Sequence, residues 1–447
     1  MKKGMFFALA ASSLLFSACS SDDAVVSTEG QNEAVQQIVL HVASSGDGLT
    51  TRAGRPLYSS QALQTIQNVR VLIYNADTKA IVKDAKLDWT TSTTYTNHGR
   101  QLTLTYKGDE RLSEGSYKVM AVGYSNNSDY NYSLDVTSET ALTGSYTDLT
   151  ATLKANAAAE EVFAGDAALT IGDDKKITNL TEGEENGVAV TLHRQVAGSF
   201  GYFQNIPASV NGKIAKTLRL VVRDKNDMLT FKDFNSSFTA NGATGSTVKY
   251  YVNGSKSAAA PTSDAQFEGG DNGYVLYSIN LNDWFPNGDE NNDGLLNAED
   301  ASWNHPGNVK TQVVKGSVFG SNFVIPFNLT SGKSTMELQL LDNAGDIIKT
   351  WIVSIPSTDV NSDDTKGVRD ENASTFNVVR NHMYNLGVKT SNGTTDPDPS
   401  NPDPDPDPDK PTPDPGKDEP EDLTKSQNLI LKVNDNWEAI HKMELGD

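Results

Sequence analysis

Oxygen-bearing side chains recur at alternate positions in one short acidic segment of the chain. Residues 289–300 read Asp-Glu-Asn-Asn-Asp-Gly-Leu-Leu-Asn-Ala-Glu-Asp. Carboxylate and amide oxygens at this spacing, with a glycine at the sixth position for the sharp turn, are suited to wrapping a hard cation such as Ca²⁺. An ordinary acidic surface loop is the alternative, and the final aspartate is shorter than the usual glutamate. We expect a structural Ca²⁺ site whose ligands are Asp289, Asn291, Asp293, the backbone carbonyl of Leu295, Asn297 and Asp300.

The only cysteine of the chain, Cys19, stands at the end of an export signal. Lys2 and Lys3 precede an apolar run, residues 5–16, that is too short to span a bilayer and fits a secretory signal. Small residues leading into a cysteine are typical of lipoproteins, in which acyl chains on that residue give a lasting membrane anchor. We expect residues 1–19 to be a lipoprotein signal with lipidation at Cys19, and an ordinary signal peptide is the alternative.

Charge and motif content argue against several classes of function. The formal net charge of −21 repels phosphate, so nucleic acid is a poor partner. The sequence contains no His-Glu-x-x-His zinc motif, no Gly-x-Ser-x-Gly nucleophile elbow and no phosphate-binding glycine loop. A pair of glycosidase carboxylates depends on spatial separation, which a sequence does not give. We therefore expect a protein that is not an enzyme.

The body of the chain consists of short runs in which apolar and polar residues alternate, separated by clusters of Asn, Asp, Gly, Ser and Thr. Such a pattern predicts an all-β fold of sandwich type. The turn residues 342–345, Asp-Asn-Ala-Gly, predict a hairpin between two of these runs. The predicted strands include residues 69–73, 102–106, 117–121, 218–222, 274–281, 323–327, 336–340 and 351–355.

Composition divides the chain into segments. The acid-rich stretch 172–186 indicates a boundary near 186–190, which gives an N-terminal β-sandwich over 53–188 and a C-terminal one over 189–392. Ten of the 17 prolines lie between Pro397 and Pro420, so residues 393–425 should form an extended, solvated Asp-Pro linker. The remaining residues, 426–447, hold two alternating runs and are too few to form a stable domain alone.

The two ends of the exported chain carry similar strands. Ile38-Val39-Leu40-His41-Val42 near the start matches the pattern of Leu429-Ile430-Leu431-Lys432-Val433 near the end, although chance similarity between strands is an alternative. The second terminal run has apolar residues at Trp437, Ala439, Met443 and Leu445. Either end could therefore fill the same position in a sandwich.

A candidate cleavage site separates the first strand from the rest. Arg52-Ala53 lies in a polar loop where a trypsin-like protease could cut, whereas Arg55 precedes Pro56 and is a poor substrate. Cutting there would release residues 20–52 as a propeptide. The propeptide contains the first strand, which we expect at a sheet edge and whose apolar residues are Ile38, Leu40 and Val42. The vacant slot could accept residues 426–447 of another copy by β-augmentation, and head-to-tail contacts of this kind propagate into an open filament.

The chain resembles the type V pilins, or fimbrillins, of Bacteroidetes. The resemblance is carried by the lipoprotein start, the Thr-Arg-Ala at 51–53, and the segments 115–121, 190–197 and 380–386. It implies two tandem transthyretin-like β-sandwiches, cleavage at Arg52, donor-strand polymerisation by the C-terminal strand pair, and anchor and tip pilins as further partners. The Asp-Pro linker is longer than polymerisation needs, which leaves the reach of the donor open.

Presence of both the cleavage site and the tail favours a stalk subunit, which starts as an outer-membrane lipoprotein precursor and ends in an extracellular fimbrium. An anchor would keep its first strand, and a tip subunit would need no donor tail. The alternatives are a fimbrial tip adhesin and a monomeric surface lipoprotein that binds glycan and keeps its own first strand.

Overall fold

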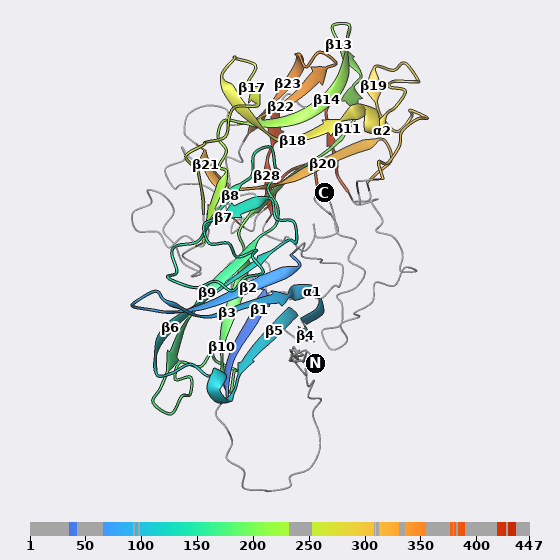
Figure 1. Cartoon of the computed structure of the whole chain (residues 1–447). Coiled ribbons are helices and arrows are strands. Elements are labelled where there is room, and N and C mark those ends of the chain that lie inside the picture. The colour runs from blue at the N-terminus through green and yellow to red at the C-terminus, as the bar shows by residue number, and fades with distance from the viewer. Residues whose placement is uncertain are drawn as a thin grey trace, which may run out of the picture.

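The computed structural model describes residues 35–42, 66–92, 94–96, 99–231, 253–307, 309, 313–329, 336–354, 376–378, 380, 383–388, 418–425 and 428–434. In these ranges the chain is almost entirely β-structure (Figure 1). The α-helices there, α1 (Trp89–Ser92) and α2 (Leu281–Trp284), are one turn each, and the 3₁₀-helix η1 covers Gly108–Glu110. None of the described helices is long and apolar enough to cross a membrane. The expected all-β class is confirmed.

The first sandwich is built from strands of the N-terminal half. Along the hydrogen bonds their order is β3-β2-β6-β9-β10-β1-β5-β4. β10 pairs with β9 only at His193 and Arg194 and with β1 along residues 187–192, so the sheet changes layer at β10. The strands are β1 (Gln36–Val42), β2 (Asn68–Asn75), β3 (Ile81–Asp88), β4 (Thr94–Thr96), β5 (Gly99–Tyr106), β6 (Gly115–Tyr124), β9 (Phe163–Ile171) and β10 (Gly187–Arg194).

One core fills this first sandwich. Alternate residues of β2 point into it because side chains on a strand alternate between the two faces, and so do alternate residues of β6 and β10. Its buried members include Ile38, Leu40, Val69, Val71, Ile73, Leu102, Val119, Leu169, Val188 and Val190.

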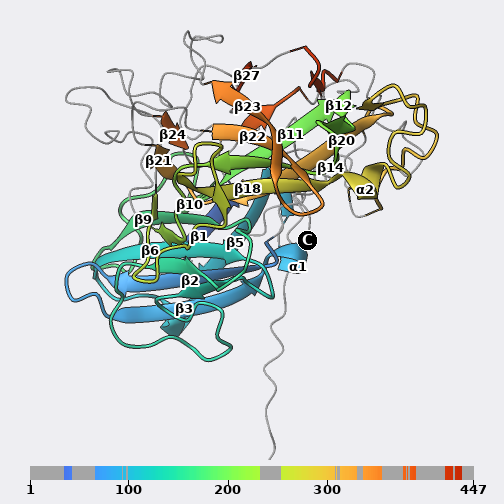
Figure 2. The same ribbon diagram turned by 90° about the horizontal axis from the view of Figure 1, so that it is seen from above.

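The second sandwich has two sheets, which Figures 1 and 2 place in the other half of the molecule. The first sheet has the order β20-β11-β25-β28, with β26 also on β11. The second has the order β17-β18-β14-β22-β23-β27, with β13 also on β14. The strands are β11 (Ala197–Gln204), β13 (Ser209–Val210), β14 (Lys213–Val222), β17 (Ala265–Gln266), β18 (Asn272–Asn280), β20 (Ser317–Val324), β22 (Met336–Asp342), β23 (Ile347–Ser354), β25 (Met383–Leu386), β26 (Glu421–Asp422), β27 (Asn428–Ile430) and β28 (Lys432–Asn434).

Side chains of both sheets meet in one core, which contains Phe200, Leu218, Leu338, Trp351 and Leu386. The predicted hairpin is confirmed, because β22 and β23 pair antiparallel on either side of the 342–345 turn. Gly345 takes a φ of 84° there, a backbone conformation that glycine adopts without steric cost.

A small sheet joins the two halves of the chain. Its order is β16-β15-β8-β7, from β7 (Tyr130–Tyr132), β8 (Thr150–Leu153), β15 (Met228–Thr230) and β16 (Gly254–Ser255). Together with the loops beside it, it covers the outer face of β2 and β6 and forms a third core, which includes Leu72, Met120, Leu229 and Phe231. β2 is therefore buried on both faces. The remaining short strands are two pairs, β12 (Ile206–Pro207) with β19 (Leu295–Leu296) and β21 (Phe327–Leu329) with β24 (Phe376–Val378).

The structure differs from the predicted segmentation at two places. The boundary at 188/189 falls inside β10, which belongs to the first sandwich through β1 and β9. The acid-rich stretch before it is the connection between β9 and β10, and Ile177 within it is buried and bridges to Ile171.

The end of the linker is the second difference. Residues 418–425 are not a free extended linker, because β26 pairs with β11 and the Leu423 side chain is 1% exposed. Burial of the Leu423 side chain and the backbone pairing of β26 with β11 stabilise this segment relative to the extended, solvated state. The linker before residue 418 lies outside the described residues.

Candidate functional site

The first strand, β1, lies inside its sheet. It pairs parallel with β10 through residues 37–42 and antiparallel with β5 through residues 36–41. The expectation of an edge position is therefore wrong. Both rows of backbone groups on β1 have partners, so removing it would leave a slot with unpaired backbone groups on two sides. We call this position, between β10 and β5, the β1 slot.

The apolar side chains of β1 complete the first core. Ile38 is 1% exposed and Leu40 is 0% exposed. Leu40 lies opposite Leu102 on one side and Val190 on the other. Burying each of the two side chains is worth roughly 1.5–3 kcal/mol. The third predicted residue, Val42, continues the strand and pairs with Leu192.

Two polar residues of β1 that the sequence did not single out also hold the strand. The side chain of Gln36 is 1% exposed and hydrogen bonds to the backbone of Leu112 and Lys175. The His41 ring nitrogen Nε2 lies 3.0 Å from the Thr191 hydroxyl on β10. The position of Gln36, two residues before Ile38 and four before Leu40 and therefore on the same face of the strand, was the sequence signal that could have identified it.

The start of the predicted donor segment is folded onto its own chain. β27 extends the β23 edge of one sheet in parallel, and β28 extends the β25 edge of the other sheet antiparallel. Leu429 and Leu431, at 1% and 0% exposed, are part of the second core. The segment thus passes from one sheet of the second sandwich to the other. Val433 lies in β28 and pairs with Tyr384.

Several predicted site residues lie outside the described residues. They are Cys19, Arg52 and Ala53 near the start, and Trp437, Ala439, Met443 and Leu445 near the end. Their roles stay predictions.

The predicted calcium loop folds around its own backbone. Asp289 accepts hydrogen bonds from the amides of Asp293 and Gly294, at 3.2 and 2.8 Å. Asp293 accepts from the Leu295 amide and the Asn297 side chain, at 2.8 and 2.7 Å, and these bonds lower the pKa of Asp293. Gly294 has a φ of 87°, as its place in the turn requires.

Asp300 does not join the other predicted ligands. It is 0% exposed, and its two carboxylate oxygens accept the backbone amides of Glu290 and Asn297 at 2.8 and 2.9 Å. Throughout the described ranges, no group of three or more His, Cys, Asp or Glu side chains is placed to hold a metal ion. A cation at this loop would therefore rely on Asp289, Asn291, Asp293, the Leu295 carbonyl and Asn297, with Asp300 fixing the loop.

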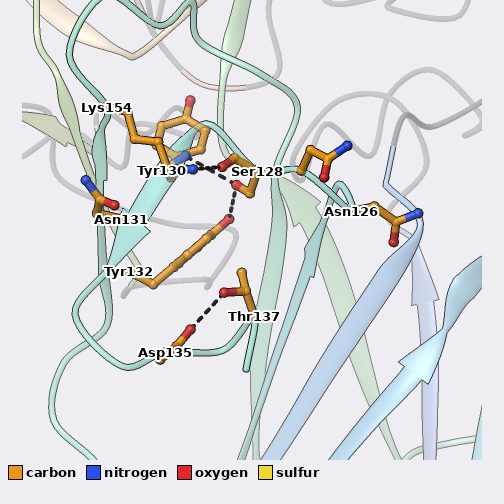
Figure 3. Close-up of a pocket in the computed structure, with 9 residues that line it drawn as sticks. Asn126, Ser128, Tyr130, Asn131, Tyr132, Asp135, Thr137 and Lys154 are labelled. Atoms are coloured by element: carbon orange, nitrogen blue, oxygen red, sulfur yellow. Dashed lines mark hydrogen bonds between the residues drawn. The ribbon is translucent and has the colours of Figure 1, made fainter. Parts of the chain in front are cut away.

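A polar cavity of about 510 Å³ opens beside β7 (Figure 3). The Ser128 hydroxyl donates to Glu160 at 2.5 Å, and the Lys154 ammonium donates to the Ser128 carbonyl at 2.5 Å. Burial raises the pKa of Tyr132, whose ring packs near Phe231. The lining residues are Asn126, Asn127, Ser128, Tyr130, Asn131, Tyr132, Asp135, Thr137 and Lys154.

Comparison with known proteins gives structural resemblance but no match in sequence. No protein-family profile matches the chain, and no curated protein is similar to it in sequence. The chain is similar in structure to fimbrial proteins of Bacteroidetes. One is the fimbrial anchor protein Mfa2 from Porphyromonas gingivalis, with 10% identity over 79% of this chain and 90% of that one and a TM-score of 0.33.

Two further examples have comparable coverage. The tip fimbrial protein Mfa3 from Porphyromonas gingivalis, with a C-terminal truncation, is 9% identical over 79% of this chain and 94% of that one, with a TM-score of 0.31. A fimbrial assembly protein from Parabacteroides distasonis is 15% identical over 80% and 92%, also with a TM-score of 0.31.

Proposed function

We propose that this chain is a structural stalk subunit of an extracellular fimbrium. It is exported as a lipoprotein through Cys19, cleaved after Arg52, and polymerised when the tail of one copy, residues 426–447, occupies the β1 slot of the next. Its partners are further copies of itself, a trypsin-like maturation protease and the anchor and tip subunits. The observation that carries this proposal is the position of β1, paired on both sides and filling the core with Ile38 and Leu40.

Loss of β1 would be costly for an isolated molecule. Its removal would expose the apolar residues that Ile38 and Leu40 cover and would leave backbone groups of both β5 and β10 without partners. Buried backbone groups without partners are strongly unfavourable, so such a slot binds a matching strand avidly. The strand joins the body of the chain only through the segment that contains Arg52, so a single cut suffices to free it.

Transfer of the tail into the slot of a neighbour should form more backbone hydrogen bonds than it breaks. β27 and β28 cover three residues each where they pair with their own chain, whereas β1 covers seven and is paired on both sides. Leu429 and Leu431 would exchange one apolar core for another, so their burial is conserved in the transfer. The gain in backbone pairing favours movement of the tail to the slot of a neighbour.

Cleavage followed by imaging tests this proposal. The purified precursor is incubated with a trypsin-like protease and examined by gel electrophoresis and electron microscopy. We expect ladders or filaments and a new N-terminus at Ala53, with Arg52→Ala remaining monomeric. Monomers after complete cleavage of the wild-type chain at Arg52 would overturn the proposal.

The polar cavity beside β7 favours a second candidate function, glycan binding at the cell surface. Amide and hydroxyl groups such as those of Asn127, Asn131 and Thr137 can exchange hydrogen bonds with sugar hydroxyls. A glycan-array screen tests it: binding that is lost in Asn127→Ala combined with Asn131→Ala, with filament formation unchanged, would add adhesion to the structural role. Binding with no assembly after cleavage would instead favour the monomeric lipoprotein.

A further inference from the structure

The β1 slot ends in a small buried polar pocket that is filled by one side chain. The Gln36 side-chain Nε2 donates to the Leu112 carbonyl at 3.0 Å and to the Lys175 carbonyl at 2.9 Å. Its Oε1 accepts the Leu112 amide at 2.8 Å. Gln36 is thereby bonded to two loops that lie 76 and 139 positions further along the chain. We call the polar groups of Leu112 and Lys175 the amide pocket.

The backbone groups of the amide pocket lose their Gln36 partner if β1 leaves. Leu112 is 5% exposed and Gln36 is 1% exposed, so water has little access to the two Leu112 groups, whereas Lys175 is an exposed residue at the rim of the pocket. A primary amide satisfies all three backbone groups together, because it offers two N–H donors and a carbonyl acceptor. An aliphatic side chain in the same place would leave the buried Leu112 amide and carbonyl without their partner, which is unfavourable.

The tail carries the same side chain at the same offset. When Leu429 is aligned with Ile38 and Leu431 with Leu40, Gln427 falls on Gln36. The similarity between the two ends of the chain therefore covers residues 36–42 and 427–433. It includes a glutamine, which the alternating apolar pattern of a strand does not require.

Further along the strand, the same alignment places Lys432 on His41. His41 lies 3.0 Å from the Thr191 hydroxyl, and it pairs with Gln101 on β5. A lysine ammonium can donate to a hydroxyl oxygen, so this position also tolerates the exchange.

We infer that Gln427 is the register-determining residue of the donor strand and occupies the amide pocket of the neighbouring copy. This inference rests on the proposed function, because it assumes that the tail of one copy enters the β1 slot of another. Leu429, Leu431 and Val433 alone specify which face of the strand turns inward, and a slip of two residues keeps that face. Only the glutamine distinguishes the correct register from such a slip.

A pair of matched variants tests the energetic part. In fibres made by cleaving the full-length precursor, we expect Gln427→Leu to speed subunit dissociation about tenfold to a hundredfold in denaturant, because buried groups lose their partners. Asn428→Leu, the neighbour on the opposite face of the strand, should stay within about threefold of wild type. The reciprocal change Gln36→Leu should lower the urea midpoint of the uncleaved precursor and leave the fibres unchanged, because Gln36 is removed with the propeptide.

Cross-linking tests the register itself. Cys19 is the only cysteine and leaves with the propeptide, so engineered pairs report without background. Lys432→Cys with Gln101→Cys should cross-link copies of the cleaved chain, because Gln101 lies opposite position 41 of β1. Lys432→Cys with Thr103→Cys should not, because Thr103 lies opposite position 39, two residues away.

The outcomes separate the two proposals. If wild-type subunits assemble but Gln427→Leu dissociates at the wild-type rate, or if the Thr103 pair cross-links in place of the Gln101 pair, the register inference is overturned and the proposed function stands. If cleaved wild-type chains do not assemble, or if Leu429→Asp assembles normally, the proposed function fails and the inference fails with it.

Discussion

At the scale of single residues, β1 is held by a few fully buried side chains. Leu40 is 0% exposed and lies between β5 and β10, so truncating it opens a cavity in the first core. We expect Leu40→Ala to lower the free energy of unfolding of the precursor by about 2–5 kcal/mol, measured by urea denaturation. Leu180→Ala serves as the control, because Leu180 is 46% exposed and should change it by less than about 0.5 kcal/mol. A loss as small as that of the control would mean that Leu40 does not fill the core.

Asp422 lies in β26, the short strand that precedes the tail. Desolvation opposes ionisation of Asp422, but hydrogen bonds from Thr424, Asn205 and Lys425 outweigh it and lower the pKa of Asp422 from 3.8 to about 2. A carboxyl group with a depressed pKa in the folded state stabilises that state above pH 4, and the contribution is lost as the pH falls from about 4 to 2.

Thermal unfolding of Asp422→Asn against wild type measures this contribution. We expect the variant to melt at a lower temperature at pH 6, and most of the difference to be lost at pH 2. Asp109→Asn, at an exposed position of η1, should show little difference at either pH. A difference for Asp422→Asn that is the same at both pH values would show that its charge does not stabilise this contact.

The sequence did not predict which polar residues are buried. Arg70 alternates with apolar residues, yet it is 2% exposed, because a loop covers the outer face of β2. Its guanidinium pairs with Asp84 and also donates to the carbonyls of Ser138 and Thr140. Such partners are brought together only by the tertiary fold, so alternation alone could not identify them.

At the scale of elements, local pattern predicted strands and turns but not their neighbours. The 342–345 hairpin was predictable because turn chemistry and strand alternation are local. The internal position of β1 was not, since its partners, β5 and β10, lie about 60 and 150 residues away. The boundary near 188 was misplaced for the same reason, because an acidic connection between β9 and β10 has the composition of a linker.

The calcium loop is an element whose role stays a prediction. Calorimetry on the folded protein should show one stoichiometric Ca²⁺ event, and Asp289→Ala combined with Asp293→Ala should abolish it, because the predicted site loses two of its carboxylates, a partly exposed one at Asp289 and an exposed one at Asp293. Asp346→Ala, a carboxylate on a distant turn, is the control. Absence of heat in the wild-type protein would mean that the loop is held only by its own hydrogen bonds.

The tail is the second element with a testable role. Deleting residues 426–447 removes β27 and β28 and exposes the β23 and β25 edges, so we expect a modest loss of stability together with complete loss of self-assembly after cleavage. Size-exclusion chromatography of the cleaved protein measures assembly, and Glu438→Ala within the full tail is the control. Incorporation of the deletion variant into fibres at the wild-type level would favour a tip adhesin over a stalk subunit.

At the scale of the whole molecule, the two sandwiches are joined by a shared sheet. β8 from the first half pairs with β15 from the second, and Phe231 and Ile325 pack in the same core as Leu72 and Val122. The two sandwiches are therefore connected by hydrogen bonds and apolar packing as well as by the chain itself.

The most direct test of strand replacement is a mass and N-terminal analysis of protein assembled on the cell surface. We predict that fibres sheared from cells consist of chains that begin at Ala53, and that residues 36–42 are absent from them. Fibres built from chains that still begin at acylated Cys19, with β1 retained between β5 and β10, would contradict the account.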